Sequence, residues 1–326
     1  MRNVTFRQLQ IFVEAAEGQS FVRAAERLRI SPAAISFQIK QIESMSGFAL
    51  FERTGRTVVL SDAGTALLGY ARTVLQALHD ADQSLTALRG ATGGRITIGL
   101  ISTAKYIVPH ILARFQAESP GISIHLRDGN RSEITEALER GEIELAVTGR
   151  PPDGTDLTAE VFAPHPTVLV APPGHKLAED GLHPPAALRG ERFIVREDGS
   201  GTRKLMEQYF RDAGLPLRIA MTSSSNETIK QAVMAGMGMA MLSRHTVGLE
   251  LALGLMRVVP VEGLPLMRSW FVAHRRTMPL LPVHSRLRSF LLTHGQRVIE
   301  DLEDGYRAAF APLTGARAAA TLAALP

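Results

Sequence analysis

The sequence contains no cysteine among its 326 residues, and only one tryptophan and four tyrosines. Without cysteine, neither a disulfide framework nor a zinc site with thiolate ligands can form. No apolar run approaches the roughly 18 residues that a membrane span needs, and the segment MRNVTFRQLQ lacks the basic and then apolar pattern of a secretory signal. These absences predict a cytoplasmic protein without a membrane segment.

Motifs that would indicate catalysis are also missing. The sequence has no G-x-S-x-G elbow, no Walker loop and no G-x-G-x-x-G after a predicted strand. Its ten histidines are scattered, with none in an H-x-x-x-H or H-x-H pair. We therefore expect no enzymatic activity, no metal site and no resident cofactor.

Positive charge is in slight excess and is unevenly distributed. The formal net charge is +4, and residues 1–61 carry eight Lys and Arg against five Asp and Glu. Most of the excess therefore lies at the N-terminal end of a chain long enough for about two domains. A basic end permits nucleic-acid binding without demonstrating it, because proteins that never meet DNA also carry surface arginines and lysines.

Residues 20–43 have the pattern of two short amphipathic helices joined by a tight connection. The first helix begins at Ser20, a good N-cap, and the second at Ser31 followed by Pro32. Apolar residues follow helical spacing in both: Ala24, Ala25 and Leu28, then Ile35, Ile39 and Ile42. The pattern predicts a helix-turn-helix, although an ordinary helical hairpin would also fit these residues.

The elements on either side favour the DNA-binding interpretation. The second helix carries small, polar and basic residues opposite its isoleucines, namely Ala33, Ser36, Phe37 and Lys40. A preceding helix over 5–17, with Phe6, Leu9, Val13 and Ala16 on one face and Gly18 at its end, would complete a three-helix core. The following segment FERTGRTVVLS predicts a β-hairpin wing, with Arg53 and Arg56 near a tip that could reach phosphates, although such tips are commonly just solvated.

A single long helix is predicted from Asp62 to Leu88. Its apolar residues alternate at spacings of four and three, as in a coiled-coil seam: Leu67, Ala71, Val74, Leu78, Ala81, Leu85 and Leu88. The stripe could instead pack on the chain's own domain, but its length favours a dimerisation linker. Gly90, Gly93 and Gly94 then mark a boundary. A dimer would present two copies of the second helix and predicts an inverted-repeat DNA site.

From residue 95 onward, short β-branched runs alternate with helical patterns. This alternation predicts an α/β domain with mainly parallel sheets and two small lobes. We expect strands near 96–101, 122–128, 143–149, 167–172, 192–196, 217–221, 239–243 and 269–274, and helices near 106–118, 131–140, 202–213, 226–236 and 282–303. The Ala-rich residues 305–326 are expected to form a mobile tail or a marginal helix.

Polar and basic residues gather at the carboxyl ends of several predicted strands, where α/β proteins bind ligands on helix N-termini. Each such group is more often a helix cap than a ligand site. Together, however, they indicate a cleft for a small, phosphorylated anion. They are Ser102 to Lys105, Asn130 with Arg131, Gly149 with Arg150, Glu197 to Arg203, and Ser223 to Asn226.

The course of the chain from Phe6 to about residue 300 resembles a LysR-type transcriptional regulator. The segment FRQLQIFVEAAEGQSFVRAAERLRISPAAISFQIKQIE carries this resemblance. Five later segments resemble the subgroup that regulates the Calvin-cycle (RuBisCO) operon. They are ISTAKYIVPHIL, GNRSEITEALERGEIELAVTGRPP, FAPHPTVLVAPPGHKLA, VREDGSGTRKLMEQYF and SSSNETIKQAVMAGMGMAMLSRHTV.

The resemblance implies an α+β multidomain fold similar, in its C-terminal part, to type 2 periplasmic binding proteins. The winged helix-turn-helix would span 1–61, the linker helix 62–90, the effector domain 91–304 and the tail 305–326. Lobe I would take about 95–164 and 269–304, and lobe II about 165–268.

The resemblance also implies partners and sites. We expect an activator that binds double-stranded DNA and RNA polymerase as a homodimer or homotetramer, and an effector such as a phosphorylated Calvin-cycle intermediate or NADPH. By position, DNA would contact Ser31, Pro32, Ala33, Ser36, Phe37, Lys40, Arg53 and Arg56. The effector would contact Ser102, Thr103, Lys105, Asn130, Arg150, Gly201, Thr202, Arg203, Asn226 and Glu227.

Two positions depart from the family's pattern. Many members carry glutamine in place of Pro32, and often a polar residue in place of Phe37. Without the glutamine a bidentate adenine contact is lost, whereas Phe37 can still touch a thymine methyl group. The base preference within the half-site is therefore left open by the sequence. Regulation of a different metabolic operon is one alternative. The other, from a different class, is a solute-binding or enzymatic α/β protein whose N-terminal helices serve only for dimerisation.

Overall fold

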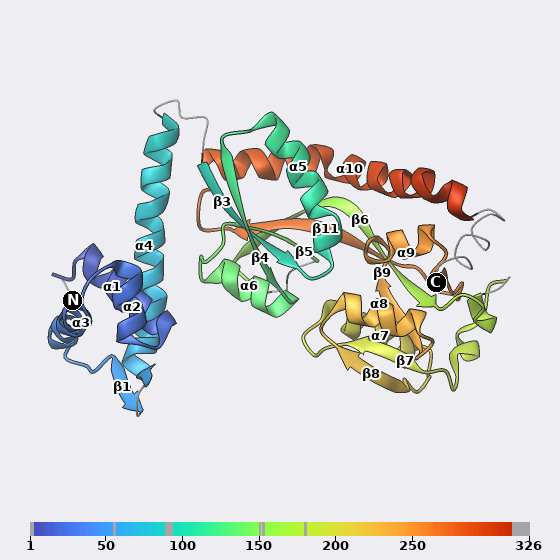
Figure 1. Cartoon of the computed structure of the whole chain (residues 1–326), viewed down its shortest axis with the longest axis horizontal. Helices are drawn as coiled ribbons and strands as arrows, with labels where there is room; N and C mark the ends of the chain where they lie inside the picture. Colours follow the sequence, from blue (N-terminus) through green and yellow to red (C-terminus); the bar gives the residue numbers. More distant parts are fainter. Residues whose placement is uncertain are drawn as a thin grey trace, which may run out of the picture. The chain divides into compact units, whose positions relative to one another are not determined.

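A computed structural model describes residues 3–54, 57–88, 94–149, 151, 154–178 and 181–314 (Figure 1). The chain divides into two compact units. The first comprises Met1–Ala91 with Arg140–Glu142, and the second comprises Thr92–Glu139 with Ile143–Pro326.

The first unit begins with the three expected helices, α1 (Phe6–Gly18), α2 (Phe21–Leu28) and α3 (Pro32–Ser46). The predicted N-caps are confirmed, because the hydroxyls of Ser20 and Ser31 accept hydrogen bonds from the backbone N–H groups of the first turns of α2 and α3. Pro32 occupies the first turn of α3, where a backbone N–H would have no partner within the helix, so proline costs no hydrogen bond there. The helix-turn-helix is therefore fixed by local chemistry.

The core of these helices confirms most of the predicted apolar positions. Ala24, Ala25, Ile35, Ile39 and Ile42 are all buried.

The predicted face of α1 was wrong at one residue: Phe6 is 42% exposed, and Phe12 is fully buried instead. The reason is that α1 packs against α2, α3 and α4, so its buried side is wider than one stripe. That side includes Gln8, whose Nε2 donates to the side-chain oxygens of Gln38 and Gln41.

A hairpin follows α3, as expected for a wing. Strands β1 (Phe51–Thr54) and β2 (Thr57–Leu60) pair antiparallel, with Thr54 opposite Thr57. Arg56 and the position of the Arg53 side chain lie outside the described part of the chain, so their expected phosphate contacts stay predictions.

The long helix α4 spans Asp62–Leu88, as predicted. Its seam divides into two parts. Leu67 and Ala71 pack into the first unit's own core, so for them the expectation of a partner helix was wrong. Beyond them Val74, Leu78 and Leu85 are 45%, 50% and 58% exposed. Gly90 and Gly93 lie outside the described residues, and Gly94 opens the next strand.

The second unit is built on one sheet, which in the described residues has the strand order β4-β3-β5-β11-β6-β9-β7-β8, with β10 beside β6. Its strands are β3 (Gly94–Ile101), β4 (Ile122–Gly129), β5 (Leu145–Thr148), β6 (Leu157–Ala171), β7 (Phe193–Arg196), β8 (Ile219–Ser223), β9 (Met239–Ser243), β10 (Arg257–Val258) and β11 (Leu266–Arg275). Its α-helices are α5 (Val108–Glu118), α6 (Arg131–Glu139), α7 (Gly201–Asp212), α8 (Asn226–Met234), α9 (Gly248–Ala252) and α10 (Pro282–Thr314).

The sheet is mixed, which corrects the expectation of mainly parallel pairing. Strands β6 and β11 run antiparallel to each other and to their neighbours β9 and β5. Parallel pairs lie at both ends of the sheet. Strand β6 begins at Leu157, well before the predicted start at 167. The prediction began too late because Pro164 and Pro166 interrupt the strand pattern of the sequence. Helix α10 runs to Thr314, through the start of the predicted tail.

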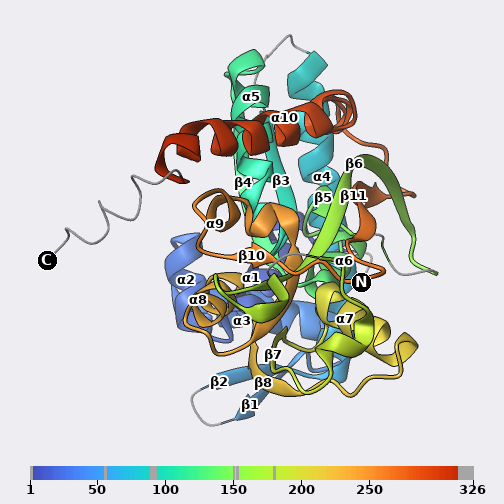
Figure 2. The same cartoon turned by 90° about the vertical axis from the view of Figure 1, so that its right-hand side faces the viewer.

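Separate hydrophobic clusters cover the two ends of this sheet. Figure 2 shows α5 and α10 beside β3 at one end and α7 and α8 beside β7 at the other. One holds Trp270 of β11 with residues of β3, α5 and α10. The others pack α7 and α8 around β7 and β9. Strands β6 and β11 contribute residues to the clusters at both ends, so these two strands connect the two ends of the sheet. The lobe boundaries at 164/165 and 268/269 stay predictions.

Two glycines of α10 provide a test of its packing. A Cβ at Gly295 would lie 2.6 Å from Cδ2 of Phe162, whereas nothing lies within 4 Å of a Cβ at Gly305. Gly305→Ala should stabilise the protein by about 1 kcal/mol through helix propensity. Gly295→Ala should instead destabilise it, by about 1–3 kcal/mol, because Phe162 must move. Urea unfolding of both variants measures the change in the free energy of unfolding, which should have opposite signs. Equal changes would contradict the packing of Gly295 on Phe162.

Candidate functional site

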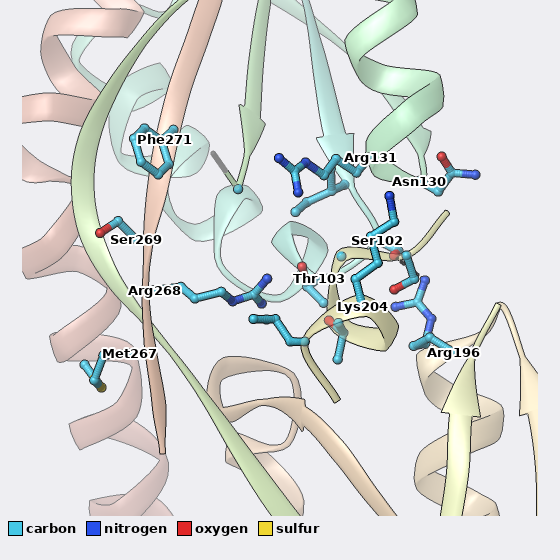
Figure 3. A pocket seen from close by; sticks show the side chains of 16 residues that line it. Ser102, Thr103, Asn130, Arg131, Arg196, Lys204, Met267, Arg268, Ser269 and Phe271 are labelled. Atoms are coloured by element: carbon cyan, nitrogen blue, oxygen red, sulfur yellow. Dashed lines mark hydrogen bonds between the residues drawn. The ribbon is translucent and has the colours of Figure 1, made fainter. Parts of the chain in front are cut away.

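A cavity of about 480 Å³ lies at the carboxyl ends of β3, β4, β5 and β7 and along β11 (Figure 3). Five of the ten expected effector residues line it, namely Ser102, Thr103, Asn130, Gly201 and Thr202. Arg131 lines it as well, beside Asn130 as expected. The remaining lining residues are Ile101, Gly149, Arg196, Ser200, Lys204, Leu205, Met267, Arg268, Ser269 and Phe271.

The lining is strongly cationic. It contains Arg131, Arg196, Lys204 and Arg268, and no carboxylate among the described residues that line it. No described acidic side chain is paired with Lys204, which lies in the first turns of α7. A site with this balance of charge favours an anion over a neutral or cationic ligand.

Arg196 is already neutralised and organises the site. Its side chain is 3% exposed and forms a bidentate pair with Glu197, at 2.7 and 2.9 Å. It also donates to Asn226 Oδ1 at 2.7 Å and to Ser102 Oγ at 2.8 Å. Asn226 in turn donates from Nδ2 to the carbonyl oxygen of Ser102 at 3.2 Å. Arg196 and Asn226 therefore hold the loop after β3 in place.

Arg131 and Arg268 converge on the N-terminus of α7. A Cβ at Gly201 would lie 3.7 Å from Nη1 of Arg268 and 3.9 Å from Nη1 of Arg131. Burial, and then the neighbouring Arg131 charge, lower the pKa of Arg268 to about 10. Burial likewise lowers the pKa of Arg131. Both shifts mean that the local environment disfavours these two positive charges.

The first turn of α7 adds donors to this positive region. The side chain of Ser200, the N-cap of α7, accepts no hydrogen bond from the helix, so the first N–H groups remain available to a ligand. The positive end of the helix dipole lies at the same place. Asn130 contributes less than expected, because its Oδ1 already accepts from the N–H of Glu133 and caps α6.

Four expected effector residues do not line the cavity. Lys105 is exposed and pairs with Asp128 at 2.9 Å. Arg203 forms an ion pair with Glu207, with 2.8 Å between Nε and Oε1. Asn226 donates a hydrogen bond to the backbone carbonyl of Ser102 and does not reach the cavity itself. Glu227 accepts a hydrogen bond from the Tyr106 hydroxyl at 2.6 Å. Arg150, the fifth, lies outside the described residues.

The expected list omitted Arg196, Lys204 and Arg268. Arg196 is the last residue of the predicted strand 192–196, and the polar group expected after that strand began only at Glu197. Lys204 follows Arg203, and only the direction of α7 decides which of the two faces the cavity. Arg268 precedes the predicted strand 269–274, and no motif marks it.

The expected DNA-contacting side of α3 is open. Ser31, Pro32, Ala33 and Lys40 are exposed, Phe37 is 58% exposed and Ser36 is partly buried. More than half of this aromatic side chain is therefore uncovered in its own domain. The face is therefore available to a partner.

The described part of the chain lacks the features of two other classes of site. No helix there is both long and apolar enough to cross a membrane. No group of three or more His, Cys, Asp or Glu side chains there is placed to hold a metal ion.

Comparison with known proteins covers both units. Residues 6–65 match the family model of the bacterial regulatory helix-turn-helix protein, lysR family, and residues 89–296 match the LysR substrate binding domain. The chain is 46% identical over 294 residues to the HTH-type transcriptional regulator CfxR of Cupriavidus necator, covering 90% of this chain and 93% of CfxR. It is 38% identical to the RuBisCO operon transcriptional regulator of Allochromatium vinosum, covering 91% and 98%.

A solved structure resembles the second unit. It is the regulatory domain of CcmR from Synechocystis in complex with 2-PG, which is 34% identical, has a TM-score of 0.59, and covers 61% of this chain and 96% of that domain. The helix-turn-helix, the linker helix and the cationic cavity thus occur together in a chain that both family models match. This protein belongs to the LysR family of bacterial transcriptional regulators.

Proposed function

We propose that this regulator controls a RuBisCO carbon-fixation operon in response to a small phosphorylated anion. The observation that carries the proposal is the convergence of Arg131 and Arg268 on the N-terminus of α7, in a cavity whose described lining has no carboxylate. The relatives with RuBisCO regulation in their names support the choice of operon. No catalytic step is assigned to the chain.

The effector's phosphate group would occupy the N-terminus of α7. Arg131 and Arg268 would then donate to its oxygens, as guanidinium groups do to phosphate. Lys204 and the hydroxyls of Ser102 and Thr103 would bind a second polar group. A volume of about 480 Å³ suits a small metabolite. The CcmR relative binds 2-PG, and 2-phosphoglycolate is such a molecule.

The DNA-binding part of the proposal places α3 in the major groove. Phe37 and Lys40 would lie toward the bases and the phosphates, with Ser31, Pro32, Ala33 and Ser36 beside them and the wing on the adjoining backbone. The exposed part of the α4 seam would pair two chains, and two such dimers would form a tetramer. Contact with RNA polymerase at the promoter belongs to the same proposal.

Two lysines test the effector site. Lys204 lines the cavity, and Lys105 is paired with Asp128 outside it. Lys204→Ala should weaken 2-phosphoglycolate binding about tenfold, the size of one charged hydrogen bond, and Lys105→Ala should change it little. Calorimetry on the full chain measures both, with glycolate as the ligand that lacks phosphate. Equal affinities for glycolate and 2-phosphoglycolate would refute a phosphate site.

The α3 face is tested by Lys40→Ala. If Lys40 contacts a phosphate, its removal should weaken binding to all sequences alike and reduce the salt slope of log affinity by about 1. Fluorescence anisotropy with an inverted-repeat duplex at several salt concentrations measures this slope. Lys176→Ala, which changes an exposed lysine paired with Glu191, is the matched control. A loss confined to one base position would contradict a phosphate contact.

The linker seam is tested by Leu78→Glu. Leu78 is half exposed in a single chain, and a carboxylate buried in a helix pair is costly. Sedimentation should therefore show dissociation of the dimer. Thr73→Glu adds the same charge to α4 outside the seam and should leave the dimer intact. Loss of the dimer in both variants would mean that general charge repulsion, and not the seam, is responsible.

A further inference from the structure

His165 lies immediately behind the proposed phosphate site without lining it. It is fully buried in β6, directly across the strand pair from Arg268 of β11. Its Nε2 is 3.4 Å from Nη2 of Arg268. Its ring stacks on Trp270, with a centroid distance of 3.7 Å and an interplanar angle of 10°. Because directly paired residues and residues two apart on a strand share a face, all three side chains lie on one side of the sheet.

The contact with Arg268 fixes the protonation of the imidazole. A guanidinium has donors only, so Nε2 of His165 must be the acceptor. The ring is then neutral, with its proton on Nδ1. Burial, followed by the charges of Arg268 and His245, holds the pKa of His165 well below its usual range, in agreement with this assignment. No hydrogen-bond partner for Nδ1 is found among the described residues.

The backbone on either side of His165 lacks two N–H groups. Pro164 and Pro166 flank it and lack the N–H groups that a strand would contribute. They face Ser269 and Met267, the residues on either side of Arg268, and the register shifts between Trp270 and Phe271. The Nε2 contact of His165 is therefore a restraint on the Arg268 side chain in addition to the pairing of the two strands.

One further contact anchors this group of side chains. The indole Nε1 of Trp270 donates to Nδ1 of His245 at 3.0 Å. Trp270 is fully buried, so the ring on which His165 stacks has a fixed position. His165 is thus held on one side by a rigid aromatic surface and presents its acceptor nitrogen to Arg268 on the other.

We propose that His165 is a positioning residue for the effector: its neutral imidazole accepts a hydrogen bond from Arg268 and holds that guanidinium toward the phosphate. This inference rests on the proposed effector site and adds to it the residue that orients its cation. A guanidinium already in place loses no rotamer freedom when the ligand binds. The affinity for the ligand is higher because this entropy cost is avoided.

Two substitutions separate the two contacts of His165. His165→Phe keeps an aromatic ring over Trp270 and removes the acceptor, whereas His165→Gln keeps an acceptor and removes the ring. Calorimetry of the full chain with 2-phosphoglycolate should show about tenfold weaker binding for His165→Phe, the size of one hydrogen bond to a charged group. His165→Gln should recover part of that loss. Thermal unfolding of His165→Phe should be unchanged or improved, because a buried N–H without an acceptor disappears.

A double-mutant cycle with Arg268→Ala decides whether His165 acts through Arg268. In the Arg268→Ala background, His165→Phe should cause no further loss of affinity. Additive losses, or wild-type affinity in His165→Phe alone, would overturn the positioning role while leaving the effector site intact. If wild-type protein binds neither 2-phosphoglycolate nor inorganic phosphate, both proposals fail together.

Discussion

The cost of holding two partly buried cations, Arg131 and Arg268, beside one helix N-terminus is the constraint on which the cavity of the second unit depends. Two guanidiniums at the positive end of a helix are unfavourable unless the fold holds them there. Burial lowers the pKa of both residues, and the Arg131 charge lowers that of Arg268 further. An anion bound between them, as proposed, would offset this cost. Ligand binding and the stability of this arrangement would then be linked through one electrostatic interaction.

The elements that hold these cations come from distant parts of the chain. Arg131 opens α6, Arg268 lies on β11, and the helix N-terminus belongs to α7. Arg196 then ties the end of β7 to Ser102 after β3 through neutral and charged hydrogen bonds. A ligand that contacts all of these elements links segments packed in separate hydrophobic clusters. Such a geometry is suited to changing the relation between those clusters on binding, as a metabolite sensor requires.

Features governed by local chemistry could be read from the sequence. Ser20 and Ser31 cap their helices as predicted, and α4 has the predicted bounds, because capping and helical periodicity depend on neighbouring residues. The start of β6 could not be predicted, since Pro164 and Pro166 interrupt the strand pattern and proline is rare inside a sheet. The cavity's cations were partly missed for a related reason. Arg203 and Lys204 are adjacent in sequence, and only the tertiary placement of α7 decides that the second lines the cavity.

The divided seam of α4 extends this argument to assembly. Ala71 is buried in its own domain, so the first part of the helix fixes the direction in which α4 leaves the helix-turn-helix. The later residues Val74, Leu78 and Leu85 remain about half exposed. Burying one such side chain contributes roughly 1.5–3 kcal/mol when it is complete, so three half-exposed ones on a single stripe favour a partner helix. The helix that fixes the direction of each α3 is therefore also the helix that carries the proposed dimer seam.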